Sequence, residues 1–183
     1  VADTYNKEWL GTVVGSNLGR GVFNATGNGM ITYGHVRDWE NLQKIEGFNI
    51  WCKGYDPSYM RQTMLTNFNV PIRIGKAIVL PGDAVLAKSG AVLFIPPHLV
   101  ERIVFTSEFT ALSDEFGKEM IERGVYTAGQ IDSLWDDKMN ESFMKWLNDY
   151  PDDKLPMPRK ELEKYLKDSE GQEISLIIEF IKL

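Results

Sequence analysis

The pattern of hydrophobic and polar positions divides the chain into two parts. Up to about residue 95, short apolar runs are separated by glycine, asparagine and proline, which is typical of short strands joined by turns. From Pro97 onward the apolar residues recur at three- and four-residue spacing, as they do on one face of a helix. The pattern therefore predicts an α/β first part followed by a helical second part.

Each part yields a definite set of expected elements. Residues 1–15 are expected to form a strand edge and a turn, and strands are expected at residues 30–33, 48–53, 70–74, 76–80, 84–87 and 91–95. Ser16 is expected to N-cap a helix over residues 17–27 that presents Leu18, Val22 and Ala25 on one face. Further helices are expected from Pro97 to Gly124, after the Thr127–Gln130 capping box, at 139–147 and at 158–168, before a strand at 173–182.

Composition narrows the function classes. The chain has 183 residues, a formal charge of −6 and a pI near 5.0, and its basic residues form no patch, which argues against a broad nucleic-acid surface. Cys52, the single cysteine, excludes an internal disulfide and fits a reducing compartment, so we expect a cytoplasmic protein. No apolar run approaches the ~20 residues of a membrane-spanning helix. The sequence begins with Val1, and we expect that an N-terminal part is missing.

The stretch from Ser16 to Gly19 is a candidate anion site. The first N–H groups of a helix lack partners within the helix, and the helix dipole adds partial positive charge there. A carboxylate or a phosphate is therefore a natural ligand for Ser16, Asn17 and Leu18. The alternative is that Ser16 only caps the helix while water satisfies the other N–H groups. Gly19 and Gly21 weaken a helix, which suggests that a ligand or another backbone approaches closely there.

Arg37 and Asp38 follow the strand predicted at 30–33. Arginine can hold a carboxylate or a keto oxygen with two N–H groups, and an adjacent carboxylate can hold Mg²⁺ or Mn²⁺. The alternative is a surface ion pair, or a cap for a short turn at 39–42. His35 could line the same pocket but is expected to be a packing or supporting residue. His98 is expected to face solvent, and Cys52 to be a buried thiol. No zinc-protease, nucleophile-elbow, phosphate-loop or dinucleotide fingerprint is found.

Three segments resemble one known family. GSNLG at 15–19, YGHVRD at 33–38 and VPIRIGKAIVLPGDAVLAKSGAVLFIP at 70–96 are similar to the RraA-like family. That family contains the regulator of ribonuclease activity A and the class II 4-hydroxy-4-methyl-2-oxoglutarate aldolases, and many members were once misnamed demethylmenaquinone methyltransferases. The resemblance covers about residues 1–104, which we expect to form an RraA-like α/β domain lacking its N-terminal part. Residues 105–183 would form a helical extension that ends in a strand.

The resemblance implies both a fold and a chemistry. It implies a swivelling β/β/α-type sandwich that assembles as a trimer or a dimer of trimers. In the aldolases the Arg of the RD pair binds pyruvate and the Asp binds the metal, which would place these catalytic roles on Arg37 and Asp38. Backbone amides at the helix start, here Ser16, Asn17 and Leu18, would hold the substrate carboxylate. A metal and Arg37 together would stabilise the enolate of pyruvate, with a small 2-oxo acid as substrate.

One position departs from the aldolase pattern. The aldolases carry an acidic residue where this chain has Ser16, so a carboxylate that would hold metal-bound water is replaced by a hydroxyl. The ribonuclease-regulator branch tends to lose the metal-binding Asp, which is kept here as Asp38. The first hypothesis is therefore a metal-dependent lyase, and the alternative is a non-catalytic regulator that binds a protein partner. Methyl transfer from S-adenosylmethionine is disfavoured because no glycine-rich dinucleotide-type loop follows a strand.

Overall fold

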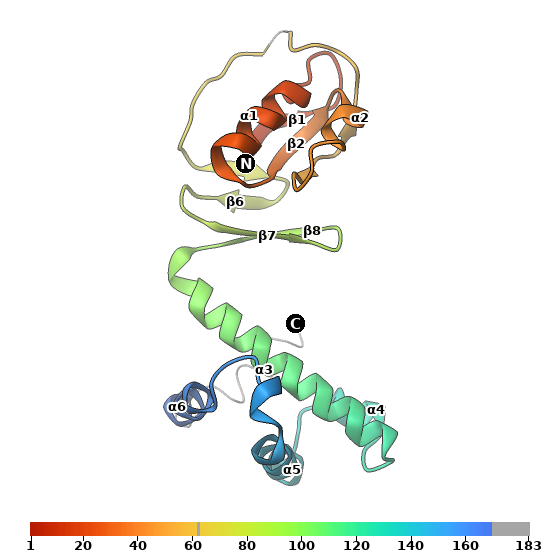
Figure 1. Ribbon diagram of the computed structural model, residues 1–183, viewed down its shortest axis with the longest axis vertical. Helices are drawn as coiled ribbons and strands as arrows, with labels where there is room; N and C mark the ends of the chain where they lie inside the picture. Colours follow the sequence, from red (N-terminus) through yellow and green to blue (C-terminus); the bar gives the residue numbers. More distant parts are fainter. Residues whose placement is uncertain (62, 170–183) are drawn as a thin grey trace. The chain divides into compact units, whose positions relative to one another are not determined.

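The computed structural model describes residues 1–61 and 63–169 (Figure 1). The chain divides into two compact units, one over Val1–Val100 and one that begins at Glu101, and each is considered by itself. The strand predicted at 173–182 lies outside the described residues.

The first unit is built on a parallel sheet. Its strands are β1 (Ala2–Lys7), β2 (Met30–Val36), β3 (Ile50–Trp51) and β4 (Gly54–Tyr55), and β2 pairs in parallel with each of the other three. Helix α1 (Ser16–Thr26) connects β1 to β2, and the short helix α2 (Trp39–Leu42) follows β2 (Figure 1). In such a βαβ arrangement the carboxyl ends of the strands and the start of the next helix meet at one edge, where α/β proteins bind ligands.

A hydrophobic cluster joins the helices to one face of this sheet. Its buried members are Val14, Val36, Leu42, Ile45 and Phe48. Gly19 lets α1 approach this cluster, because a Cβ added there would lie 2.6 Å from Leu42 Cδ2. The close approach at Gly19 is thus made by a side chain and not by the ligand or backbone that the sequence suggested. At Gly21 an added Cβ would meet nothing within 4 Å among the described atoms, so no other described backbone approaches it.

Two predictions about α1 are wrong. Gly15, not Ser16, is the N-cap residue, and no side chain caps the helix from that position. The face carrying Leu18 and Ala25 is exposed, with Leu18 44% accessible, whereas Phe23 packs against the cluster. The face of α1 that packs on the cluster contains Gly19 and Phe23, which are four residues apart. The hydrophobic pattern does not indicate this face, because glycine has no apolar side chain.

Of the six strands predicted after residue 15, only the one at 91–95 has the predicted bounds. The strand expected at 30–33 continues to Val36, and that expected at 48–53 is two short strands, β3 and β4, separated by Cys52 and Lys53. Two antiparallel hairpins follow, one of β5 (Ile72–Ile74) and β6 (Ala77–Val79), the other of β7 (Ala84–Lys88) and β8 (Ala91–Ile95). The predicted turn at Ser89 and Gly90 is confirmed, because both residues have positive φ, 52° and 82°, as a two-residue hairpin requires.

The second unit is helical. Helix α3 runs over Pro97–Glu122 and is followed by Gly124 with φ 68°, which confirms the predicted start and stop. Then come α4 (Ala128–Ile131), α5 (Asp137–Asp149), a 3₁₀ turn, η1 (Asp152–Lys154), and α6 (Arg159–Ser169). The predicted capping box of Thr127 and Gln130 is present at the start of α4.

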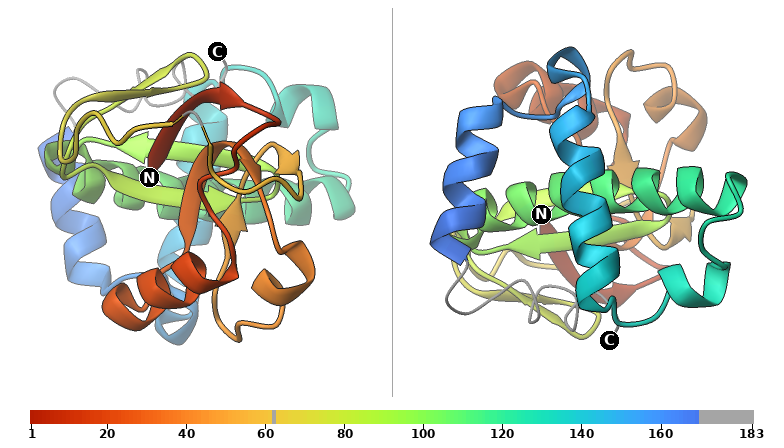
Figure 2. Two further views of the ribbon diagram at one scale, coloured as in Figure 1. Left: turned by 90° about the horizontal axis from the view of Figure 1, so that it is seen from above. Right: turned by 90° about the horizontal axis from the view of Figure 1, so that it is seen from below.

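Aromatic packing holds the second unit together. Phe116 on α3 is fully buried, and its ring lies 5.4–5.7 Å from the rings of Trp135, Phe143 and Trp146. Figure 2 shows α5 crossing α3 within this unit. None of the described helices is long and apolar enough to span a bilayer.

Candidate functional site

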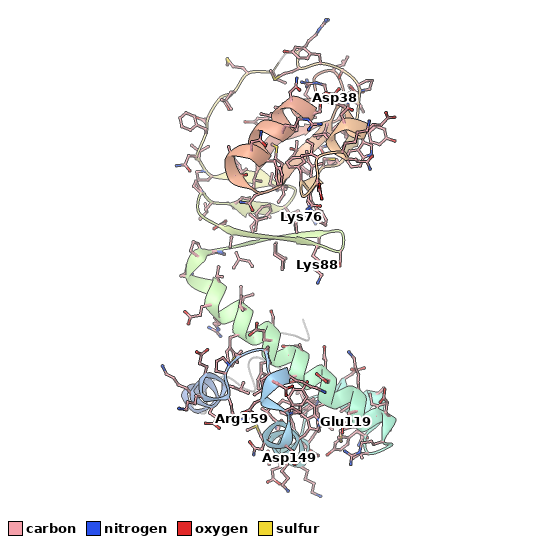
Figure 3. The ribbon with its side chains drawn as sticks, viewed as in Figure 1. Asp38, Lys76, Lys88, Glu119, Asp149 and Arg159 are labelled. Carbon is pink, nitrogen blue, oxygen red and sulfur yellow. The ribbon has the colours of Figure 1, made fainter. Side chains whose placement is uncertain are left out.

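The predicted site residues meet at the carboxyl edge of the parallel sheet. Strand β2 ends at Val36, and Arg37 and Asp38 follow it directly. Val14 forms a parallel bridge with Val36, so the chain that leads into α1 runs beside the end of β2. As a result Ser16, the first residue of α1, lies next to Asp38, which Figure 3 labels.

Asp38 is anchored through one of its two carboxylate oxygens. Its Oδ2 accepts hydrogen bonds from the backbone N–H and the hydroxyl of Ser16, both at 3.2 Å. Asp38 is the N-cap residue of α2, as the alternative expected: its backbone carbonyl accepts from the N–H groups of Asn41 and Leu42 at 2.9 and 3.0 Å, although its side chain makes no cap hydrogen bond. Within the described residues Oδ1 accepts no hydrogen bond, and Asp38 is exposed. One oxygen is thus fixed by α1 and the other is available to a ligand.

The backbone at Asp38 is unusual. Its φ and ψ of 54° and 38° place it in the left-handed region, where Asp and Asn are the non-glycine residues most readily accommodated. This conformation directs the carboxylate back toward Ser16 of α1, and residues held in such conformations cluster at functional sites.

Arg37 is held by the loop that precedes α1. Its backbone N–H donates to the Val14 carbonyl at 2.9 Å, and its Nη1 donates to the Thr12 carbonyl at 2.7 Å. The guanidinium also lies over the ring of Tyr59, 5.0 Å from the ring centroid, a cation–π arrangement. Among the described contacts Arg37 and Asp38 form no ion pair with each other. Within the described part of the chain the remaining N–H groups of the guanidinium have no acceptor and can bind an external one.

Gly15 makes the convergence of these two side chains possible. A Cβ added at Gly15 would lie 2.9 Å from both Arg37 Nε and Asp38 Oδ2. Any other residue would therefore displace the guanidinium or the carboxylate, since real Cβ contacts are longer than this. One cationic and one anionic side chain thus lie close to the Gly15 backbone.

The first turn of α1 supplies further donors at this edge. The N–H of Ser16 is taken by Asp38, and Gly19 donates to the Gly15 carbonyl at 3.0 Å. In the described part of the chain, no acceptor pairs with the N–H groups of Asn17 and Leu18, and both residues are exposed. These two groups at a helix start can bind an anion.

The structure adds four residues that the sequence did not indicate. Thr12 is only 2% exposed and bonds through its hydroxyl to the Ser58 carbonyl at 2.6 Å, while Tyr59 covers Arg37. Asp56 accepts hydrogen bonds from the backbone N–H and the hydroxyl of Ser58, and these bonds lower the pKa of Asp56. The Asp-Pro-Ser tripeptide at 56–58 could have indicated this turn in the sequence. The Asp side chain commonly accepts a hydrogen bond from the backbone N–H two residues later in such turns.

The remaining candidates lie elsewhere or are inert. His35 precedes Arg37 on β2, is half-buried, and its Nδ1 is buried without a hydrogen-bond partner among the described residues. His98 is exposed in the first turn of α3, as expected. Cys52 is only half-buried and lies between β3 and β4 instead of inside a strand, and burial raises the pKa of its thiol.

The donor set decides which kind of metal the site can accept. Within the described residues no three His, Cys, Asp or Glu side chains lie close enough together to hold a metal. A zinc site, which takes three or four protein ligands, is therefore not supported there. Magnesium keeps several waters and needs only one or two carboxylates, and the free Oδ1 of Asp38 meets that requirement. The residues present thus fit Mg²⁺ or Mn²⁺.

The family model for RraA-like proteins, described as Aldolase/RraA, matches residues 1–93. The chain belongs to the RraA-like family. Its α/β fold with C-terminal helices is the one expected from the sequence, and that expectation is confirmed.

Individual RraA-like proteins are similar over part of their length. A Halalkalibacterium halodurans protein named "Putative 4-hydroxy-4-methyl-2-oxoglutarate aldolase" is 28% identical over 97 residues, which are 53% of this chain and 46% of that protein. The chain thus spans about half the length of this curated relative.

Two solved structures are also similar. The crystal structure of Streptomyces coelicolor RraAS2, described as an unusual member of the RNase ES inhibitor RraA protein family, matches with a TM-score of 0.58 and 28% identity over 64% of this chain and 59% of that chain. RraA from Thermus thermophilis, described as an RNA-processing inhibitor, matches with a TM-score of 0.47 and 24% identity over 51% and 56%.

Proposed function

We propose that this RraA-like protein is a divalent-metal-dependent lyase, an aldolase or decarboxylase, that acts on a small 2-oxo acid. One observation carries the proposal: the Arg37 guanidinium and the Asp38 carboxylate converge over Gly15, beside two N–H groups of α1 that no described acceptor pairs with. The start of α1 can hold the substrate carboxylate. The Arg37 guanidinium can polarise the keto oxygen, and the Asp38 carboxylate can anchor the metal.

Arg37 and the start of α1 would bind the substrate. A 2-oxo acid carries its carboxylate next to its keto group, so the two acceptors need donors close to each other. The N–H groups of Asn17 and Leu18 would hold the carboxylate, and the free N–H groups of Arg37 would bind the keto oxygen. When the bond to the rest of the substrate breaks, negative charge develops on that oxygen, and Arg37 would stabilise it more strongly than in the ground state.

Asp38 would hold the metal, and Ser16 would hold Asp38. A bound Mg²⁺ or Mn²⁺ would supply Lewis-acid chemistry at the keto group. The two hydrogen bonds from Ser16 hold Oδ2 beside α1, while Oδ1 accepts no hydrogen bond among the described residues. The structural role of Oδ2 and the proposed ligand role of Oδ1 are therefore compatible in one side chain.

The hydroxyl at position 16, in place of a carboxylate, affects whether aldol cleavage or decarboxylation is supported. Aldol cleavage requires removal of a proton from the substrate hydroxyl, and the carboxylate that related aldolases place at this position is absent. Loss of carbon dioxide from a 2-oxo acid with a second carboxylate requires no such base, only stabilisation of the charge that remains. We propose that decarboxylation of oxaloacetate is the more readily supported reaction, and cleavage of 4-hydroxy-2-oxo acids the less.

A regulatory role is the second candidate. It is supported by the similarity to RraAS2, which belongs to a family named for RNase ES inhibition. In that role Asp38 would serve only to anchor α1, through the two bonds from Ser16. The candidate partner would be a protein.

Assembly into a homotrimer or hexamer is part of the proposal. Several large apolar side chains of the first unit are more than 80% exposed in this chain: Met64, Leu65 and Phe68. Monomeric proteins rarely leave such side chains uncovered in groups. Light scattering coupled to size exclusion should give a mass about three or six times the 20.8 kDa of the chain, and a monomer would contradict this assembly.

Steady-state assays distinguish lyase from regulator. We expect pyruvate to be released from oxaloacetate in the presence of Mg²⁺ or Mn²⁺, more slowly from 4-hydroxy-2-oxo acids, and at least 100-fold more slowly by Asp38→Asn and by Arg37→Lys. Asn keeps the left-handed backbone and an acceptor for Ser16, so this variant removes charge without removing the anchor. Turnover that is absent, or equal in wild type and Asp38→Asn, would exclude the lyase. A regulator would instead bind its protein partner equally well in both forms.

A further inference from the structure

We infer that Thr12 and Ser58 are positioning residues that hold the Arg37 guanidinium in place for the reaction. The inference rests on the proposed function, because it assigns Arg37 a substrate to bind. It concerns a part of the chain outside the Ser16–Asp38 corner: the loop before α1 and the segment that follows β4.

Thr12 connects Arg37 to that segment. Its carbonyl accepts from Arg37 Nη1 at 2.7 Å, and its own hydroxyl donates to the Ser58 carbonyl at 2.6 Å. Thr12 itself is 2% exposed, and both bonds are part-buried. A shift of Thr12 therefore moves the acceptor that orients the guanidinium.

Ser58 is in turn fixed by two further bonds. Its hydroxyl donates to Asp56 Oδ1, and the same oxygen Oγ accepts the Gly11 N–H at 2.9 Å. A serine hydroxyl has a single proton, so the bond to Asp56 leaves its lone pairs free for Gly11. The Ser58 N–H also donates to Asp56 Oδ1 at 2.9 Å, which closes the turn at 56–58.

The two segments approach each other too closely for a side chain at Gly11. Its φ is +130°, and an added Cβ would lie 2.6 Å from the Arg61 carbonyl oxygen. Gly11 and Thr12 are thus joined to residues 58–61 by two hydrogen bonds and one backbone contact. Tyr59, next to Ser58, places its ring over the guanidinium on which Thr12 acts.

Arg37 is consequently held from two directions by one connected unit. The Thr12 carbonyl accepts from Nη1 of Arg37, and the Tyr59 ring covers one face of the guanidinium. A free arginine has many rotamers, and ordering it during the reaction would raise the barrier. Because Thr12 and Ser58 do not supply the donors that face Gly15, they act through Arg37 and not on the substrate.

Isosteric substitutions at Thr12 test this inference. Thr12→Val keeps the shape and removes the hydroxyl, whereas Thr12→Ser keeps the hydroxyl. We expect Thr12→Val to lower kcat for pyruvate release at least tenfold and to weaken inhibition by oxalate, a mimic of the enolate of pyruvate, by a similar factor. Thr12→Ser should stay within threefold of wild type on both measures. Partial unfolding would lower kcat but would leave the inhibition constant of oxalate unchanged.

A second readout is independent of turnover. The Nε–H signal of Arg37 in ¹⁵N NMR, assigned by its loss in Arg37→Lys, should broaden or shift toward the free-arginine position in Thr12→Val and in Ser58→Ala, and should be retained in Thr12→Ser. If wild type shows no turnover, the proposed function fails, and this signal alone decides the positioning role. An Arg37 signal and an oxalate inhibition constant that match wild type in folded Thr12→Val and Ser58→Ala would overturn the inference.

Discussion

Asp38 accepts two hydrogen bonds from Ser16, a residue 22 positions earlier, and both bonds end on the same carboxylate oxygen at 3.2 Å. The pair joins the start of α1 to the end of β2 and replaces the capping bond that the N-cap residue Gly15 cannot make. The same contact leaves Oδ1 of Asp38 without a partner among the described residues. Structural anchoring and a candidate ligand position are thus combined in one side chain.

A carboxylate at position 16 should change the balance between the two proposed reactions. In Ser16→Asp a second acid would face Asp38, which favours a divalent cation between them and supplies a potential base. We expect metal affinity to rise about tenfold, and cleavage of 4-hydroxy-2-oxo acids to rise relative to oxaloacetate decarboxylation, as measured by pyruvate release from each. Ser16→Ala is the matched control and should leave the ratio unchanged. An unchanged ratio in Ser16→Asp would contradict the role assigned to this position.

Gly19 and Gly21 form a matched pair for testing the packing of α1. A methyl group at Gly19 would lie 2.6 Å from Leu42 Cδ2, so Gly19→Ala should lower the free energy of unfolding by about 1–3 kcal/mol. A methyl group at Gly21 would meet no described atom within 4 Å, so Gly21→Ala should raise the free energy of unfolding by about 0.5–1 kcal/mol through helix propensity. Urea unfolding of the two variants checks both signs, and stabilisation by Gly19→Ala would refute the observed packing.

Asp56 should make stability depend on pH in one direction. Its pKa is lowered in the folded chain by the hydrogen bonds from Ser58, so the folded state favours the ionised carboxylate. The ionised Asp56 carboxylate contributes its full stabilisation of the folded state above its ordinary, unfolded-state pKa of about 4. That stabilisation is lost as the pH falls through the lower pKa of the folded state. The stability difference between wild type and Asp56→Asn should therefore shrink as the pH falls from 7 to 3, measured by urea unfolding. The same difference at both pH values would contradict this.

Phe116 should dominate the stability of the helical unit. It is fully buried among Trp135, Phe143 and Trp146, so Phe116→Ala should cost about 3–5 kcal/mol. Phe116→Leu keeps most of the volume and should cost less. Near-ultraviolet circular dichroism during urea unfolding would follow the loss of aromatic packing. A cost below about 1 kcal/mol for the alanine variant would show that the ring cluster does not hold this unit together.

The elements with strong local signals could be predicted from the sequence. The Ser89-Gly90 turn, the long helix ended by Gly124 and the Thr127 capping box depend on residues close in sequence, and all three are present. The inward face of α1 could not be predicted, because it is set by the contact of Gly19 with Leu42, which belongs to a different element.

Only the residues of the candidate site that neighbouring sequence marks out could be predicted. Arg37 and Asp38 stand out as a pair after a buried strand, and Ser16 stands out at a helix start. Their meeting depends on the Val14–Val36 bridge, which brings distant segments side by side. The hydrogen bonds of Thr12 and Ser58 join residues 25 to 47 positions apart in the sequence. Tyr59 contacts Arg37 through its ring. No local sequence pattern indicates such contacts.

Binding of Mn²⁺ to wild type and Asp38→Asn tests the central claim most directly. The electron paramagnetic resonance signal of free Mn²⁺ falls when the ion binds, so a titration gives affinity without any assumption about the reaction. We predict one bound Mn²⁺ per chain in wild type, binding at least tenfold weaker in Asp38→Asn, and tighter binding in wild type when pyruvate is added. Equal binding by the two proteins, or no binding by wild type, would contradict a metal and 2-oxo-acid site at Arg37 and Asp38.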